Sequence, residues 1–69
     1  MIKVGGMYKH FKGDIYLVLN KATHSESNEE LVIYKNIHNG SNWARPLSMF
    51  EDKVTYQGAI VNRFEYINP

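Results

Sequence analysis

The side chains of this sequence alternate with a period of two far more often than with the helical period of about 3.6. Residues 7–11 alternate between two faces, and residues 14–20 are largely apolar on both faces, which is typical of a central strand. Residues 31–38 are rich in β-branched and aromatic side chains, which favour strands. Because helical periodicity is nearly absent, the sequence predicts an all-β fold.

Turn-forming residues separate these predicted strands. Lys12-Gly13 predicts the first turn, and the polar stretch Lys21–Glu30 predicts a long loop. Asn39-Gly40 is the strongest hairpin signal in the chain, because both residue types tolerate positive φ. We therefore expect a tight turn there, interpret Asn39-Gly40-Ser41 as turn chemistry only, and expect the return strand over Asn42–Leu47.

The last third of the chain holds one helical signal among further strands. Ser48 and Glu51 have the spacing of a capping box, which predicts a single helical turn over Ser48–Lys53. Residues 54–57 and 62–67 are two further predicted strands, separated by Gly58. Five or six short strands with one helical turn predict a small, strongly bent antiparallel barrel of the SH3-like type. An open meander with an oligomeric interface is the alternative.

Length and composition limit the protein to a few classes. Sixty-nine residues suffice for one domain, 1–69, and the absence of cysteine excludes disulfide scaffolds and cysteine metal sites. The formal net charge of +1 disfavours duplex DNA as a partner, and the short apolar runs exclude a membrane span. Met1–Gly6 lacks a secretory signal, so we expect a cytoplasmic protein. A homo-oligomer is one way for so short a chain to bury more surface.

Several runs of the chain carry a family pattern: Gly6–Leu19, Ala22–Glu26, Leu31–Tyr34, Trp43–Leu47, Met49-Phe50, Val54 and Arg63-Phe64. In this order they resemble the DUF1653 family of short bacterial and phage proteins. The resemblance spans most of the chain and implies a small β-rich domain. Because that family is uncharacterised, the resemblance implies a type of protein and no activity.

Three consecutive loop residues, His24, Ser25 and Glu26, invite a hydrolase interpretation. Neighbouring side chains in extended chain point to opposite sides, whereas a nucleophile, its base and the group that orients the base must converge. We therefore predict no enzyme. His24 and Glu26 are either binding residues on a shaped loop or part of a loop held by local hydrogen bonds. His10, His24 and His38 lie on separate predicted elements, so we predict no metal and no cofactor.

Trp43 and Arg45 share one face of the predicted return strand. Arginine presents a planar fork of donors to phosphate or carboxylate, and tryptophan presents a flat surface for stacking. The further residues that we expect to line a groove with this pair are Tyr8, His10, Tyr34 and Arg63. The alternative is structural, with Trp43 buried in the core and Arg45 paired with Glu26 or Glu51.

These residues predict a non-enzymatic binding module whose site lies between the His24 loop and the strand of Trp43 and Arg45. The ligand that suits them is planar and anionic, either a nucleotide-like molecule or a short single strand of nucleic acid. One alternative is a module that binds a protein or peptide, in one form through an exposed strand edge. Another, suggested by the phage members of the resembled family, is an oligomeric sponge that sequesters a host factor or a nucleotide signal.

Overall fold

The structure is a computed structural model that describes residues 2–67, and these residues form an all-β chain with one helical turn. The elements are β1 (Met7–His10), β2 (Ile15–Thr23), β3 (Glu30–Asn36), β4 (Asn42–Pro46), α1 (Leu47–Phe50), β5 (Lys53–Tyr56), β6 (Ala59–Asn62) and β7 (Phe64–Ile67). Within residues 2–67, no helix has the length and apolar character needed to cross a membrane.

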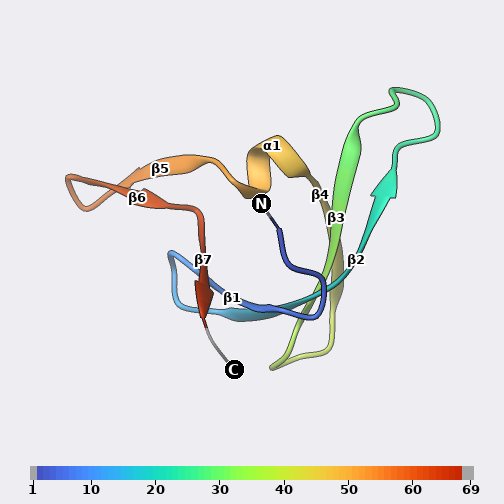
Figure 1. The fold of residues 1–69 in the computed structure, drawn as a ribbon. Coiled ribbons are helices and arrows are strands. Elements are labelled where there is room, and N and C mark those ends of the chain that lie inside the picture. The colour runs from blue at the N-terminus through green and yellow to red at the C-terminus, as the bar shows by residue number, and fades with distance from the viewer. Residues whose placement is uncertain (1, 68–69) are drawn as a thin grey trace.

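Two antiparallel sheets make up the fold. The larger has five strands in the order β4-β3-β2-β1-β7, and β5 pairs with β6 in a separate two-stranded sheet. Figure 1 shows the larger sheet bending strongly around α1, with the β5–β6 hairpin projecting to one side. The predicted fold, a small, bent antiparallel β-structure with β2 as a central strand, is confirmed. The described chain has seven strands, more than expected, and the sheet bends without closing.

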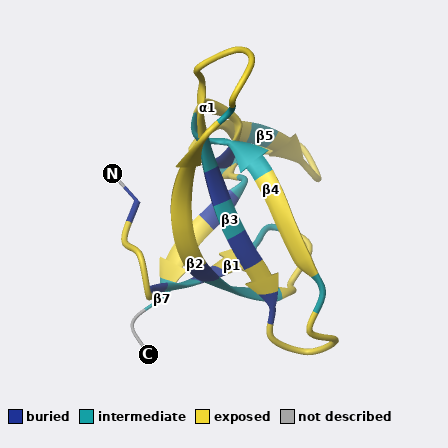
Figure 2. Cartoon of the chain, turned by 90° about the vertical axis from the view of Figure 1, so that its right-hand side faces the viewer, coloured by how far each residue is buried: buried dark blue, intermediate teal, exposed yellow. Residues whose placement is uncertain are grey.

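The core lies on the inner, concave face of the bent sheet. Alternation along β3 puts Val32 and Tyr34 on this face, with 0% and 3% of their surfaces exposed, while Leu31 and Ile33 are only partly buried on the outer face. Figure 2 shows this alternation on β3 and the greater exposure of the edge strand β4. The described core residues are Ile2, Tyr8, Val18, Val32, Tyr34, Phe50 and Phe64.

Aromatic rings supply most of this core. Phe50, delivered by α1, stacks on Phe64 with ring centroids 4.0 Å apart and an interplanar angle of 2°. Tyr8 and Tyr34 meet Phe50 edge-on, each at 5.3 Å. Because α1 carries the ring at the centre of these contacts, this short helical turn fills the space enclosed by the bent sheet.

The helical turn begins one residue earlier than the capping box predicted. Its N-cap is Pro46 and its end is Phe50, and no side chain caps its N-terminus. Ser48 lies inside the turn, so its hydroxyl is not placed ahead of the first free amides, and the predicted capping box is wrong. The turn is stabilised by its position between β4 and the aromatic core.

The hairpin predicted at Asn39-Gly40 is present, with β4 paired to β3, but its connection is longer than a two-residue turn. The connection between β3 and β4 spans residues 37–41, and within it only Gly40 has positive φ, at 75°. Asn36, 5% exposed, organises this loop, because its Oδ1 accepts hydrogen bonds from the amides of His38 and Asn39. The buried Asn36 side chain at the end of β3 therefore stabilises a longer loop where a two-residue turn was expected.

The two-residue turn of the chain lies instead at Gln57-Gly58, where both residues have positive φ, 51° and 79°. It joins Tyr56 to Ala59, which are cross-strand partners in the β5–β6 hairpin. The sequence predicted two strands separated at Gly58, and β6 was not among the predicted strands. Glutamine is an uncommon residue in this conformation, so the local sequence gave little warning.

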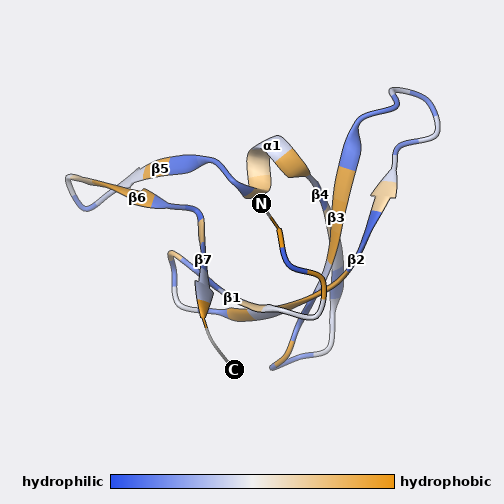
Figure 3. Ribbon diagram, viewed as in Figure 1, coloured by the Kyte–Doolittle hydropathy of each residue, from blue (hydrophilic) through white to orange (hydrophobic). Residues whose placement is uncertain are grey.

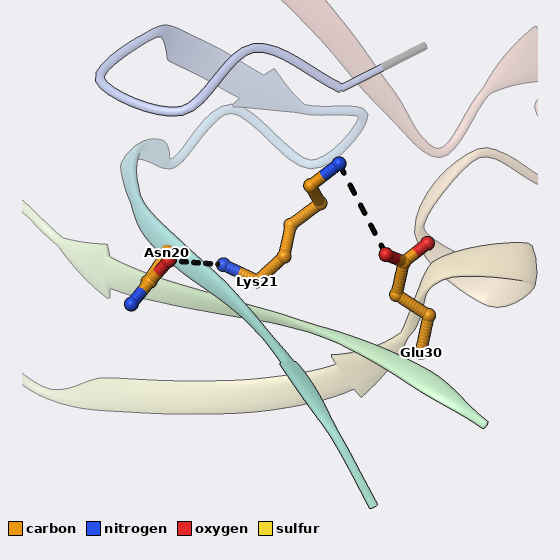
Figure 4. A network of polar contacts seen from close by, with 3 residues as sticks. All are labelled: Asn20, Lys21 and Glu30. Carbon is orange, nitrogen blue, oxygen red and sulfur yellow. Dashed lines mark hydrogen bonds and ion pairs between the residues drawn. The ribbon is translucent and has the colours of Figure 1, made fainter. Parts of the chain in front are cut away.

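The predicted polar loop is shorter than expected at both ends. β2 continues to Thr23 and β3 starts at Glu30, and these two residues are paired in register. Figure 4 shows Lys21 bridging the two strands, with its Nζ 4.0 Å from Glu30 Oε2. The loop proper is residues 24–29, and Figure 3 shows its hydrophilic character. Backbone pairing thus continues through residues whose side chains are too polar for a core.

Candidate functional site

The bend of the sheet brings together four of the residues that the sequence predicted for a binding site: His10, Tyr34, Arg45 and Arg63, hereafter the arginine cluster. Arg45 on the edge strand β4 donates a hydrogen bond from Nε to the hydroxyl of Tyr34 at 3.2 Å. The Tyr34 ring lies 5.4 Å from the ring of Phe64, and the Phe64 ring lies 5.0 Å from the His10 ring. Arg63 directly precedes Phe64 in the sequence. Strands from both edges of the sheet therefore contribute to one place.

Arg63 sits in the break between β6 and β7, where the backbone fixes it. Its amide donates to the carbonyl of Asp52 at 2.9 Å, and its carbonyl accepts from the amide of Phe11 at 3.0 Å. Its side-chain Nε is buried and has no hydrogen-bond partner within residues 2–67. A buried guanidinium donor without an acceptor is costly, so the unpaired Nε is an uncommon feature of the described residues.

His10 ends β1 on the same inner face as Tyr8. Its Nδ1 accepts a hydrogen bond from the amide of Lys12 at 3.1 Å, and its ring lies 4.4 Å from that of Phe11. Burial lowers the pKa of His10 below its usual 6.5, and the charges of Arg45, Lys12 and Arg63 lower it further, against the opposing effect of Asp14. His10 is therefore mainly neutral at pH 7, and a bound anion favours its protonation.

The lowered pKa of His10 predicts a pH dependence of stability. Because the folded protein holds this group neutral, its contribution is complete above the usual pKa of 6.5 and is lost as the pH falls toward the lowered value. Between about pH 7.5 and about pH 5.5, we expect the Tm of the wild type to fall more than that of His10→Gln.

The matched control for this measurement is His38→Gln, which removes an exposed histidine on the β3–β4 loop. Thermal unfolding followed by circular dichroism measures all three proteins. Equal slopes of Tm against pH in the wild type and His10→Gln would contradict the assignment.

Trp43 shares the inner face of β4 with Arg45, two positions away, but it is not a core residue. Its side chain is 53% exposed, so the alternative that it fills the core is wrong. Arg45 donates a hydrogen bond to the Tyr34 hydroxyl. As the last strand of the sheet, β4 has no further strand to cover Trp43, which explains this exposure.

Three other predicted site residues lie elsewhere. Tyr8 is 7% exposed, packs against Phe50, and accepts a hydrogen bond from the amide of Lys3 on its hydroxyl. His24 and Glu26 lie on the β2–β3 loop, which projects away from β1 and β7 in Figure 1. The sequence predicted a site between this loop and β4. The structure does not have that arrangement.

His24 shapes its own loop. Its Nδ1 accepts hydrogen bonds from the amides of Glu26 and Ser27, at 3.1 Å and 3.3 Å. The loop is thus held by local hydrogen bonds, as the structural alternative expected, with the His24 imidazole and the Ser27 hydroxyl as acceptors. A nitrogen that accepts two backbone amides is not directed at Ser25 or Glu26 as a base.

The hollows beside the arginine cluster are not lined by its arginines. A hollow of about 240 Å³ is lined by Ile2, Tyr8, Phe50, Glu51, Asn62 and Phe64. A second, of about 200 Å³, includes His10 but otherwise lies between β1, β7 and the β5–β6 hairpin. Neither is lined by Arg45. Within residues 2–67, no group of three metal-ligating side chains occurs, and the positive charge of the cluster opposes a cation.

Sequence reasoning missed some residues that build this site. Phe64 joins the His10 and Tyr34 rings, and Tyr16 lies 5.2 Å from the Tyr34 ring. The alternation of side chains along β2 could have indicated Tyr16, because this residue lies on the same inner face as its cross-strand partner Tyr8. Ser41 also contacts Trp43, and no motif indicated this contact.

Comparison with known proteins finds relatives over nearly the whole chain. A family model described as "Protein of unknown function (DUF1653)" matches residues 6–66, which include the arginine cluster. A crystal structure of a DUF1653 protein from Bordetella bronchiseptica is 30% identical, with a TM-score of 0.83, over 91% of this chain and 85% of that chain. No curated protein matches the chain.

Proposed function

Since this chain belongs to the DUF1653 family, whose function is unknown, we propose its function from the side chains alone: it is a non-enzymatic module that binds a small, planar anion at the arginine cluster. The observation that carries the proposal is the buried Nε of Arg63, which has no hydrogen-bond partner within residues 2–67, together with Arg45, whose charge, like that of Arg63, acts on His10. Partly buried arginines favour an anion, and their planar forks suit phosphate or carboxylate.

The planar part of the ligand is assigned from Trp43. Its 53% exposed indole shares the inner face of β4 with Arg45, so a ring stacked there can carry an anionic group toward the cluster. We assign binding rather than turnover, because His24 Nδ1 accepts the amides of Glu26 and Ser27, which ties the imidazole to its own loop. The cytoplasmic location and a homo-oligomeric state remain predictions from the sequence.

Adenosine monophosphate is the probe that tests this proposal. Titration of ¹⁵N-labelled protein followed by NMR should shift the Trp43 indole and the arginine Nε signals, whereas neutral adenosine should bind far more weakly. Arg45 and Arg63 are only partly buried, so raising salt from about 50 mM to about 300 mM should weaken binding several-fold. Salt-independent binding, or equal binding of adenosine, would contradict an anion site.

The protein-interaction alternative has one observation in its favour. β4 is an edge strand of the described sheet, and Trp43 is exposed on it. An extended peptide pairing with that edge would shift β4 backbone amides and would depend little on salt. The same NMR spectra therefore separate the two functions.

A further inference from the structure

Trp43 is exposed but held in place by a chain of hydrogen bonds. Its indole Nε1 donates to Ser41 Oγ at 2.8 Å, and that hydroxyl donates to Asn39 Oδ1 at 2.6 Å. The same Asn39 oxygen accepts from the amide of Ser41 at 2.9 Å. An exposed indole ordinarily retains rotamer freedom, whereas this one is tied to the loop before its strand.

The loop that holds the indole is itself anchored to the core. The buried side chain of Asn36 accepts the amide of Asn39 at 3.2 Å, and the amide of Asn36 donates to the carbonyl of Ser41 at 2.8 Å. Gly40 adopts positive φ between them. Trp43 is therefore connected through Ser41 and Asn39 to a buried residue, which fixes the orientation of its ring.

On the inner face of β3 and β4, the strands that carry Tyr34 and Arg45, Trp43 is the one widely exposed aromatic ring, whereas the exposed rings of Tyr56 and Tyr66 lie on β5 and β7. Tyr34 is 3% exposed, and Phe50 and Phe64, on α1 and β7, are 1% and 7% exposed. Proteins that bind single-stranded nucleic acid stack successive bases on several rings along a basic groove. One stacking surface beside two guanidiniums fits one ring that carries one anionic group.

We infer that Ser41 and Asn39 are positioning residues that hold Trp43 as a preformed stacking surface, and that the ligand class is a single aromatic ring bearing a phosphate, of mononucleotide size. This inference rests on the proposed anion site. Neither positioning residue needs to touch the ligand, because both act by reducing the freedom that Trp43 loses on binding.

The test compares adenosine monophosphate, ribose 5-phosphate and a hexa-adenylate strand. We expect Ser41→Ala to weaken the binding of adenosine monophosphate about threefold to tenfold, the effect of one hydrogen bond, and to leave ribose 5-phosphate unaffected. Ser41→Thr, which keeps the hydroxyl, should restore binding. Ser48→Ala, an exposed serine on α1, is the matched control. Hexa-adenylate should bind no more tightly than the mononucleotide.

The fluorescence anisotropy of Trp43, the single tryptophan of the chain, tests the positioning without any ligand. It should fall in Ser41→Ala and not in Ser48→Ala. Unchanged anisotropy overturns the positioning role, and equal weakening of ribose 5-phosphate does so too. Hexa-adenylate binding more than about tenfold tighter overturns the ligand class in favour of a strand. If the wild type binds none of the three probes, the proposed function fails, while the anisotropy still decides the positioning.

Discussion

Replacing Phe50 with alanine is expected to unfold a large fraction of the protein at room temperature. The side chain is 1% exposed, stacks on Phe64 at 4.0 Å, and meets Tyr8 and Tyr34 edge-on. Removing a buried phenylalanine costs about 3–5 kcal/mol. The whole stability of a domain this small rarely exceeds about 3–5 kcal/mol, so the loss and the margin are comparable. Urea unfolding followed by circular dichroism measures the change.

Met49→Ala provides the control for Phe50→Ala on the same helical turn. Met49 is 43% exposed and precedes Phe50 directly, so its truncation tests the turn without opening the core. We expect its free energy of unfolding to stay within about 1 kcal/mol of the wild type. If Phe50→Ala were no less stable than Met49→Ala, the core would not be centred on Phe50.

The second large effect is expected on binding. The double variant Arg45→Gln and Arg63→Gln should lose about 100-fold or more in affinity for adenosine monophosphate. A hydrogen bond to a charged group contributes about 1.5–3 kcal/mol, so each arginine accounts for at least about tenfold. Glutamine keeps a donor and much of the length of the side chain while removing the charge. Isothermal titration calorimetry at low salt measures the affinity.

Lys35→Gln removes one positive charge from the opposite face of the same sheet. Lys35 adjoins Tyr34 on β3 and is exposed on the outer face. We expect this variant to bind within about twofold of the wild type, because a charge on the far face is screened by solvent. A loss equal to that of the arginine variants would show a dependence on net charge alone and would contradict a located site.

The fold could be predicted because side-chain alternation records which residues face the core. Tyr8, Val18, Val32 and Tyr34 follow that parity and are buried as strand geometry requires. The turns were harder to predict from the sequence, because their conformation depends on contacts outside the local sequence. Asn39-Gly40 has strong turn propensity, but the buried Asn36 imposes a longer loop there.

The candidate site could be predicted from the sequence to the same extent as the fold. Parity places Trp43 and Arg45 on one face and Tyr34 opposite Trp43, so their association follows from strand register. Arg45 comes near His10 only because the sheet bends across its width. No local sequence pattern predicts that bend. The role of His24 in its own loop was not predictable, because an imidazole that accepts two loop amides has the same sequence signature as one that binds a ligand.

The pairing of β1 with β7 has a consequence for how the protein is made. Met7 pairs with Ile67, which is 60 positions later (67 minus 7), whereas Tyr56 and Ala59 in the hairpin are 3 apart (59 minus 56). Closing the longer span costs about 2.5 kcal/mol more in chain entropy. A chain emerging from the ribosome forms the hairpins first and completes the sheet only once β7 is free. Since that same step pairs Phe64, the neighbour of Arg63, with His10, the proposed anion site would be completed at the end of folding.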